Sequence, residues 1–557
     1  MTFVSIIVIF IELAALLSVA FVASDAHRIY RGKEGYLFRR LSDLEYLKLN
    51  KFQAFWYKFS MFICAIPAWF KKLGVKIWQW IKNCGIAIKN EFLDIGRTFA
   101  RGNWAVRLSF LIFGFGNFYY GQILRGILFL VFEIVFIGYM LVPSGGLYWL
   151  GKANFFQTGA TIGDTPPLKN QYDPILDSFY TIWGDDSVKV LLYGLLTIIF
   201  IIAFIYTWRL QVKQCRICMD ITAKGKKVRS GKQDLKSLLD DQFHKTLLAL
   251  PVLGIAVFTV LPIIYMVLIA FTSYDSNHDG FSNLFSWVGW TNFNALLDFG
   301  NGGLGITFGE ILSWTLIWSF FATFTNYFLG MFVAIMINKK GIRLKKFWRT
   351  VLVMTIAIPQ FVSLLYVSRL FTSTGILGKL FYQIPAIQQY LDTNHFVSLW
   401  DSPIVAKILL IVINIWIGIP YLMLMATGIL MNIPQDMYES SRIDGANTFQ
   451  QYTRITLPYM LFVTGPYLLT SFVNNLNNFN VIYLLSNGNP IKGTAGGASV
   501  GHTDLLITWL YKMTLGSSDT RYYDASIIGI LVFVVVAGLS LIVYNIIPST
   551  RNEEDYK

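Results

Sequence analysis

The sequence predicts an all-α integral membrane protein with about nine transmembrane helices. Hydrophobic residues make up 55% of the 557 residues and charged residues only 14%, and the mean hydropathy is +0.53. This composition is typical of membrane proteins and excludes a water-soluble enzyme. A helix needs about 20 apolar residues to cross the hydrocarbon layer. The apolar runs of that length lie at 3–24, 123–142, 188–208, 247–271, 311–337, 350–371, 405–430, 459–485 and 524–546.

The amino-terminal region begins with the apolar run 3–24, which has no basic residue before it and is longer than the core of a signal peptide. We therefore expect a retained membrane anchor. Between Lys71 and Lys89, tryptophan and isoleucine are interleaved with lysine. Tryptophan and lysine each have an apolar part and a polar end, which suits a helix lying in the membrane interface. A surface helix of a soluble domain fits the same pattern.

The second span, 123–142, contains Glu133 near its middle. A carboxylate inside the membrane is costly unless it is paired or hydrated, so Glu133 has either a transport role or a structural hydrogen bond within the bundle. Several glycines crowd the start of this span, which predicts close helix packing or a re-entrant turn. They are Gly114, Gly116, Gly121 and Gly126.

Basic residues predict the orientation of the spans. The net charge is +14. Lysine and arginine gather in 25–107, 209–246 and 339–349, whereas 272–309 contains neither. Because short basic loops stay in the cytoplasm, we expect a multi-pass protein of the cell membrane with its amino terminus outside and its carboxyl terminus in the cytoplasm. The basic loops alternate span by span, so nucleic-acid binding is a poor explanation of the charge.

Motifs for catalysis or cofactor binding are missing from the sequence. Cys215 and Cys218 lie in a predicted cytoplasmic loop, and no second Cys-x-x-Cys supplies the other two ligands of a zinc site. The five histidines are scattered, and no phosphate-binding Gly-x-x-x-x-Gly-Lys-Ser/Thr loop occurs. We therefore predict no catalytic residue, metal or cofactor, and any ATP that powers the protein would be bound by partner subunits.

The chain divides near a basic, glycine-containing loop. Residues 1–240 hold about three spans and the long basic cytoplasmic segments, which indicates an accessory region. Residues 241–557 hold the other six spans, with a polar loop at 433–458 between the fourth and fifth of them. A polar cytoplasmic loop between two long apolar segments predicts a contact site for a partner protein.

This loop resembles the cytoplasmic coupling motif of importer-type ABC permeases, which is Glu-Ala-Ala, three residues, Gly, nine residues and Ile-x-Leu-Pro. The match includes Glu439, Gly445 and Ile455-x-Leu457-Pro458, whereas Ser440 and Ser441 replace the two alanines. Glycine supplies a turn without strain, and proline suits the first turn of the next helix. The resemblance implies coupling to an ATPase through Glu439, Ser440, Ser441, Asp444, Gly445, Ala446 and Pro458.

Polar residues follow helical spacing on the two spans that flank this loop. Asn414, Gly418 and Tyr421 share one face of the seventh span. Ser471, Asn474, Asn475 and Asn478 share one face of the eighth. Neutral amides and hydroxyls both donate and accept hydrogen bonds, so they suit a neutral ligand rich in hydroxyl groups, such as a sugar. The same residues could instead join membrane helices directly.

The last 210 or so residues resemble the larger membrane subunit of maltose/maltodextrin ABC importers. The resemblance rests on motifs in the same order, namely Pro359–Ser363, Asn414–Tyr421, the coupling loop, Ser471–Phe479, Ser486–Pro490 and Thr503–Leu506. It implies a six-helix type I importer core and a sugar site in the middle of the membrane. The implied sugar contacts are Asn414, Ile417, Gly418, Tyr421, Ser471, Asn474, Asn475 and Asn478. Asn474 stands where that family has an aromatic ring, which leaves open an oligosaccharide other than maltose.

The resemblance also implies partners, which are a second homologous permease subunit, two ATP-binding subunits and an extracellular sugar-binding protein. The segment 272–309 is short where that family carries a large inserted domain, so the binding protein would dock on other loops. Two alternatives remain open. A proton-coupled secondary transporter using Glu133 predicts internal repeats and midplane carboxylates, and neither is clear. A membrane scaffold predicts that the asparagine faces only join helices.

Overall fold

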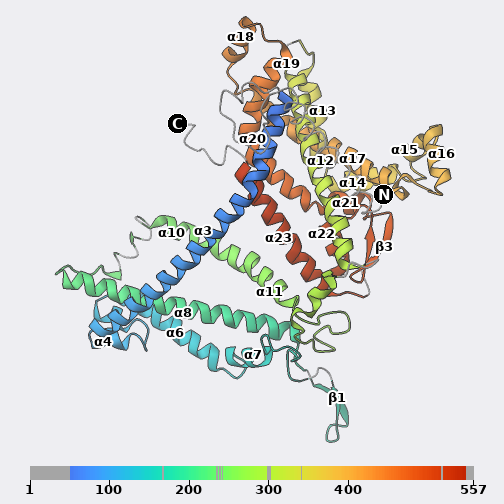
Figure 1. The fold of residues 1–557 in the computed structure, drawn as a ribbon. Helices are drawn as coiled ribbons and strands as arrows, with labels where there is room; N and C mark the ends of the chain where they lie inside the picture. Colours follow the sequence, from blue (N-terminus) through green and yellow to red (C-terminus); the bar gives the residue numbers. More distant parts are fainter. Residues whose placement is uncertain are drawn as a thin grey trace, which may run out of the picture. The chain divides into compact units, whose positions relative to one another are not determined.

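The chain is mainly helical and forms two compact units. The computed structural model describes residues 51–165, 169–182, 184–231, 233, 236–237, 240, 242–297, 303–339, 341–515 and 519–546. One unit comprises residues 1–138 and 201–243, and the other comprises residues 139–200 and 244–557. Figure 1 labels their helices and strands. We call them the smaller unit and the larger unit.

The prediction of a helical membrane protein is confirmed. The described residues contain seven helices that are long and apolar enough to cross a membrane, or eight if a bent helix pair counts as one span. They are Ile123–Leu141, Ser187–Ala223, Phe243–Ile269, Leu304–Asn338, Pro403–Leu430, Thr448–Leu476 and Tyr522–Leu541, and the bent pair is Lys345–Ala357 with Gln360–Leu370. Each matches one predicted span. The predicted span 3–24 lies outside the described residues, so the number nine is not confirmed.

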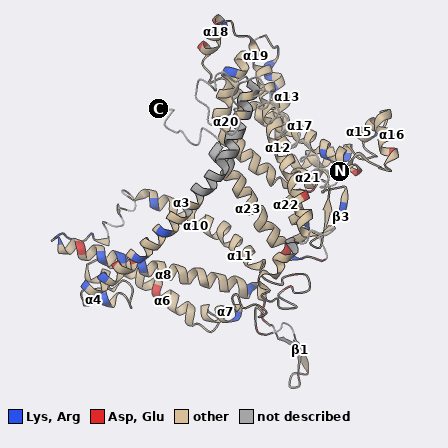
Figure 2. Ribbon diagram, in the orientation of Figure 1, with Lys and Arg blue, Asp and Glu red and all other residues tan. Residues whose placement is uncertain are grey.

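The smaller unit is built on the long helix α3. Its elements are α3 (Lys51–Arg101), α4 (Trp104–Leu108), α5 (Phe115–Tyr119), most of α6 (Ile123–Leu141) and the second half of α8 (Ser187–Ala223). Two ion pairs join α8 to α3, from Arg209 to Glu91 at 2.8 Å and from Arg216 to Asp94 at 2.6 Å. The side chains of Trp78 and Ile81, within the predicted interfacial segment, are exposed. Figure 2 shows the basic residues gathered on α3, α4 and the end of α8.

Glu133 lies in a polar core of the smaller unit, where its side chain and that of Gln211 both have hydrogen-bond partners. The Glu133 carboxylate is buried and accepts a hydrogen bond from the Phe113 N–H at 2.8 Å. Gln211 of α8 accepts from the Gly114 N–H at 3.2 Å and donates to the carbonyl of Ser109. Gly114 and Gly126 approach so closely that a Cβ on Gly114 would collide with the Gly126 backbone. The structure therefore gives Glu133 a structural hydrogen bond next to a turn of the chain.

The larger unit begins with loops that hold a half-buried ion pair. Lys152 at the end of α7 (Gly146–Ala153) donates to Asp185 at 2.7 Å. Burial raises the pKa of Asp185, but hydrogen bonds from Lys152 and from the backbone of Thr165 and Asp164 outweigh it and lower the pKa to about 2. The next elements are the hairpin β1 (Lys169–Asp173) and β2 (Ser178–Ile182), then α10 (Phe243–Ile255), η1 (Ala256–Val260), α11 (Leu261–Ile269) and η2 (Gly289–Leu297).

The rest of the larger unit is a bundle around α12 (Leu304–Asn338) and α17 (Pro403–Leu430). These helices run parallel, because Trp314 packs near Leu410 at their first halves and Met331 packs near Met423 at their second halves. Helix α20 (Leu457–Leu476) packs beside them through Met460 (Figure 1). The other helices are α13 (Lys345–Ala357), α14 (Gln360–Leu370), α15 (Ile376–Tyr382), α16 (Pro385–Thr393), η3 (Leu399–Asp401), α18 (Gln435–Ile443), α19 (Thr448–Gln451), η4 (Tyr452–Thr456), α21 (Phe479–Leu485), α22 (Leu506–Leu515) and α23 (Tyr522–Ile546).

Two predicted spans differ from the observed helices. The span predicted at 350–371 is broken at Pro359, where α13 and α14 meet at 93°. The span predicted at 459–485 ends at Leu476, and the separate helix α21 follows. Asn478 starts α21 by accepting a hydrogen bond from the Val481 N–H at 3.3 Å, which is a helix N-cap. The last hairpin, β3 (Ile491–Ala495) with β4 (Ala498–Gly501), leads to a buried ion pair between Asp504 and Lys512 at 2.8 Å.

Candidate functional site

Polar side chains from three helices meet inside the bundle. Asn326 of α12 and Asn414 of α17 are buried. Gly418 lies next to Asn326, because a Cβ at Gly418 would collide with the Asn326 amide. Asn475 of α20 donates to Thr323 of α12 at 3.0 Å. We call these five residues the polar seam, and glycine at 418 is what allows α17 to approach α12 at this level.

Two side-chain atoms of the polar seam have no hydrogen-bond partner in the described part of the chain. They are the Oδ1 atom of Asn326 and the Nδ2 atom of Asn414. Leaving a buried polar group without a partner costs about 1–3 kcal/mol, so such groups in membrane helices are either a liability or a binding site. One is an acceptor and the other a donor, and hydroxyl groups can donate to the first and accept from the second.

A cavity of about 350 Å³ lies at the break between α13 and α14, against α17. Two of the predicted sugar contacts, Ile417 and Tyr421, line it together with Trp416. Pro420 has no N–H, so the Trp416 carbonyl lacks the usual helical hydrogen bond from that residue. The Tyr421 ring is 53% exposed and lies 6.2 Å from the Tyr467 ring of α20. The cavity thus combines aromatic rings with a bend in the backbone.

The remaining predicted contacts of the eighth span are placed differently. Ser471 hydrogen-bonds with Tyr467, the partner ring of Tyr421. Asn478 donates to Asn475 at 3.2 Å and caps α21. Asn474 is exposed. The structure therefore brings Asn414, Gly418 and Asn475 together in the polar seam, and Ile417 and Tyr421 in the cavity, and leaves Asn474 apart from both groups.

Sequence reasoning missed the contribution of α12. Its residues Thr315, Ser319, Thr323 and Asn326 are all buried and lie on one face of the helix. These residues recur at helical spacing in the sequence, but the phenylalanines and tryptophans between them make the pattern hard to recognise. Only packing against α17 and α20 shows which face of α12 is turned inward.

The predicted coupling loop forms a short exposed helix, α18 (Gln435–Ile443). Glu439, Ser440, Asp444, Gly445 and Pro458 are exposed, and Ser441 and Ala446 are half-buried. Gly445 ends the turn after α18 with a φ of +80°, a conformation that favours glycine. The apolar side chains of Ile443 and Phe449 are 86% and 71% exposed. An acidic residue beside exposed apolar side chains is a surface suited to a protein contact.

Ser441 has a specific contact that an alanine would lack. Its hydroxyl accepts a hydrogen bond from Gln451 at 2.8 Å and donates to the Tyr438 carbonyl at 2.8 Å. Gln451 ends α19 (Thr448–Gln451), which leads through η4 (Tyr452–Thr456) into α20. The Tyr438 hydroxyl lies 2.9 Å from that of Thr456. These contacts join α18 to the start of α20.

Comparison with known proteins decides the family. Residues 326–551 match the binding-protein-dependent transport system inner membrane component family. The maltodextrin transport system permease protein MdxF of Bacillus subtilis is 34% identical over 66% of this chain and 84% of its own length. The chain belongs to the carbohydrate ABC importer permeases. This permease is also 30% identical to the maltodextrin permease protein MalC of Streptococcus pneumoniae, over 78% of this chain and 93% of that protein.

A relative named for a different sugar is similar to about the same degree. The galactooligosaccharides transport system permease protein GanP of Bacillus subtilis is 31% identical over 77% of this permease and 94% of its own length. Membership of the family makes this chain a multi-pass membrane transport subunit rather than an enzyme. Relatives of comparable identity are named for two classes of oligosaccharide, maltodextrins and galactooligosaccharides.

Proposed function

We propose that this permease carries a neutral oligosaccharide, of the maltodextrin or galactooligosaccharide class, into the cell through the polar seam and the adjoining cavity. The observation that carries the proposal is the pair of buried, partnerless amide atoms on Asn326 and Asn414. Sugar hydroxyls both donate and accept, so one sugar unit can satisfy both atoms without burying a charge. Ile417, Tyr421 and the other predicted contacts at Ser471, Asn475 and Asn478 supply further polar and aromatic surface around this path.

In this proposal, ATP bound by two partner subunits supplies the free energy for transport. The permease itself binds no cofactor. Glu439 to Pro458 forms the contact with those subunits. The exposure of Glu439, Ile443 and Phe449 supports that role, as do the hydrogen bonds that join α18 to α20. ATP-driven movement of α18 would tilt α20 against α12 and so open the seam to each side in turn. A ligand shifts such an equilibrium only by its different affinity for the two states.

The complete importer would contain a second homologous permease subunit and an extracellular sugar-binding protein. We assign residues 241–557 to the permease core and residues 1–240 to an accessory region, with the amino terminus outside and the coupling loop and carboxyl terminus in the cytoplasm. Basic residues at 339–349, on the same side as α18, support this orientation. The proton-coupled alternative has no support, because the Glu133 carboxylate is occupied by the Phe113 N–H.

The test is ATP-dependent uptake by the purified complex in lipid vesicles, with binding protein and a panel that includes maltotriose and galactotriose. Glu439→Ala should abolish uptake of the transported sugar. Asp436→Asn, which removes another exposed acid from the same helix α18, is the matched control and should transport normally. Full uptake by Glu439→Ala, or uptake that follows a proton gradient without ATP, would refute the proposal.

A further inference from the structure

A second cavity lies in the larger unit, away from the polar seam. It has a volume of about 530 Å³ and is bounded by α15, α16 and the segment 396–399. This segment comes just before α17, and α18 follows the other end of α17. The cavity is therefore at the end of α17 opposite to the coupling helix, which is the outer end in the proposed orientation. We call it the outer cavity.

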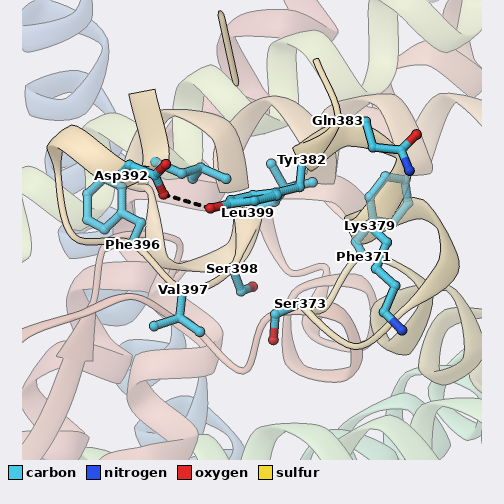
Figure 3. A pocket seen from close by; sticks show the side chains of 12 residues that line it. Phe371, Ser373, Lys379, Tyr382, Gln383, Asp392, Phe396, Val397, Ser398 and Leu399 are labelled. Carbon is cyan, nitrogen blue, oxygen red and sulfur yellow. Dashed lines mark hydrogen bonds between the residues drawn. The ribbon is translucent and has the colours of Figure 1, made fainter. Parts of the chain in front are cut away.

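The outer cavity combines aromatic rings with hydrogen-bonding groups of both kinds. Phe371, Tyr382 and Phe396 contribute rings, and Gln383, Asp392 and Ser398 are among the polar residues that line it. Figure 3 shows the Tyr382 ring between Asp392 and Gln383, with the side chains of Ser373 and Ser398 below it in this view. Rings that stack on the apolar face of a sugar, beside amide, carboxylate and hydroxyl groups that meet its hydroxyls, are the chemistry of a carbohydrate site.

The rings and polar groups are held in place by other contacts. The Tyr382 hydroxyl donates to Asp392 at 2.8 Å. The Phe371 ring stacks on Phe381 at 6.0 Å and meets Trp400 edge-on at 6.4 Å. Ser398 caps η3 by accepting from the Trp400 N–H at 3.0 Å. Such support keeps a site preformed, which lowers the entropic cost of binding.

Size and charge define the ligand class. The volume falls within the range of about 300–1,000 Å³ that is typical of small-ligand pockets. The lining contains one lysine, Lys379, and one aspartate, Asp392, so the charges balance. The lining also contains apolar side chains, among them Leu391, Val397 and Leu399, beside the hydrogen-bonding groups. The balanced charge and the mixture of rings and polar groups favour a neutral polyhydroxylated ligand over an anion.

We propose that the outer cavity is a second carbohydrate site, which holds a unit of the transported oligosaccharide before that unit reaches the polar seam. The proposal rests on the proposed function, because it takes its ligand to be the same sugar. It makes the outer cavity a subsite that raises the local concentration of sugar at the outer end of α17.

The experiment measures binding of maltotriose and galactotriose to the complete complex in nanodiscs, without binding protein or ATP, by saturation-transfer NMR and calorimetry. All variants also carry Asn414→Leu, so that binding of sugar at the polar seam contributes little to the measured affinity. Phe396→Ala and Gln383→Leu should each weaken binding of the transported sugar at least tenfold. Leu380→Ala truncates an exposed side chain of α15 outside the cavity and should change binding less than twofold.

The other outcomes each contradict the proposal in a recognisable way. Unchanged sugar binding in both Phe396→Ala and Gln383→Leu, with normal sugar uptake by the wild-type complex, would overturn the outer site and leave the proposed function intact. The affinity of the same variants for the binding protein is measured in a separate titration, and a loss of that affinity with unchanged sugar affinity would make the cavity a docking surface instead. Failure of the wild-type complex to import any oligosaccharide would overturn the proposed function and this inference with it.

Discussion

The two units differ in how they treat buried polar side chains. In the smaller unit, Glu133 and Gln211 have hydrogen-bond partners on the backbone of a nearby turn. In the larger unit, Asn326 and Asn414 are as deeply buried, yet each has an atom with no partner in the described chain. A polar group inside a membrane is costly in either case, so a group with a protein partner suits a structural role and a group without one suits contact with a ligand. The contrast supports our proposal that the polar seam is the sugar path.

Among the substitutions that test this comparison, the largest effect is expected from removing an unsatisfied amide. Asn414→Leu deletes the partnerless Nδ2 atom in a similar volume. We expect kcat/KM for sugar uptake to fall roughly 10- to 100-fold, because a lost hydrogen bond to the bound sugar costs about 1–3 kcal/mol. The melting temperature of the complex should be unchanged or higher, because no protein hydrogen bond is lost. Wild-type uptake in this variant would place the sugar elsewhere.

Glu133→Leu tests the buried polar group that has a protein partner. It leaves the buried Phe113 N–H without its acceptor, which should lower the free energy of unfolding by about 1–3 kcal/mol. The KM for sugar should stay within twofold of the wild-type value in the variant that folds. Glu133→Gln keeps an acceptor oxygen and is the matched control, with a smaller loss of stability. A large rise in KM, or uptake that becomes independent of ATP, would restore a transport role to Glu133.

Asp185 extends the comparison to a charged group of the larger unit that has a protein partner, Lys152. Because its pKa of about 2 lies below the ordinary 3.8, the stabilisation is complete above about pH 4 and is lost as the pH falls toward 2. Asp185→Asn should cost about 1–2 kcal/mol of stability at neutral pH, after solvent screening is allowed for. Thermal unfolding between pH 2 and 7 measures this. An equal pH dependence in wild type and variant would rule out Asp185 as its source.

The smallest effect is expected from Ser441 in α18, the proposed coupling helix. Ser441→Ala restores the residue that the family motif usually has, but removes the hydrogen bond from Gln451. We expect uptake to fall no more than about tenfold, since a typical hydrogen bond contributes about 0.5–1.5 kcal/mol. The ratio of ATP hydrolysed to sugar transported reports this effect. Gln451→Leu should behave in the same way, and a normal ratio in both variants would make the contact incidental.

Sequence predicted the membrane fold well because hydropathy is a local property. The spans from α6 to α23 follow from apolar runs, and the polar loop at 433–458 indicates the coupling helix by its motif. Details set by tertiary contacts were not predictable in this way. The partner of Glu133, for example, is a backbone N–H next to the turn at Gly114.

The candidate site was predictable only in part, for a similar reason. Helical spacing grouped Asn414 with Gly418 and Tyr421, but it could not separate the buried seam from the cavity. It also placed Asn474 with Asn475, although the structure leaves Asn474 exposed. Asn326 escaped notice because its inward face is defined by neighbours distant in the sequence. Burial and hydrogen-bond partners, rather than residue type, distinguish the two uses of asparagine.

Protection of a cysteine at position 414 tests the central claim most directly. The four native cysteines are first replaced, Asn414→Cys is introduced, and its alkylation is followed in the complex with binding protein and a non-hydrolysable ATP analogue. We predict that the transported oligosaccharide slows alkylation at least tenfold, whereas a sugar that is not transported has no effect. An alkylation rate that saturating transported sugar leaves unchanged would contradict the assignment of the polar seam as the sugar path.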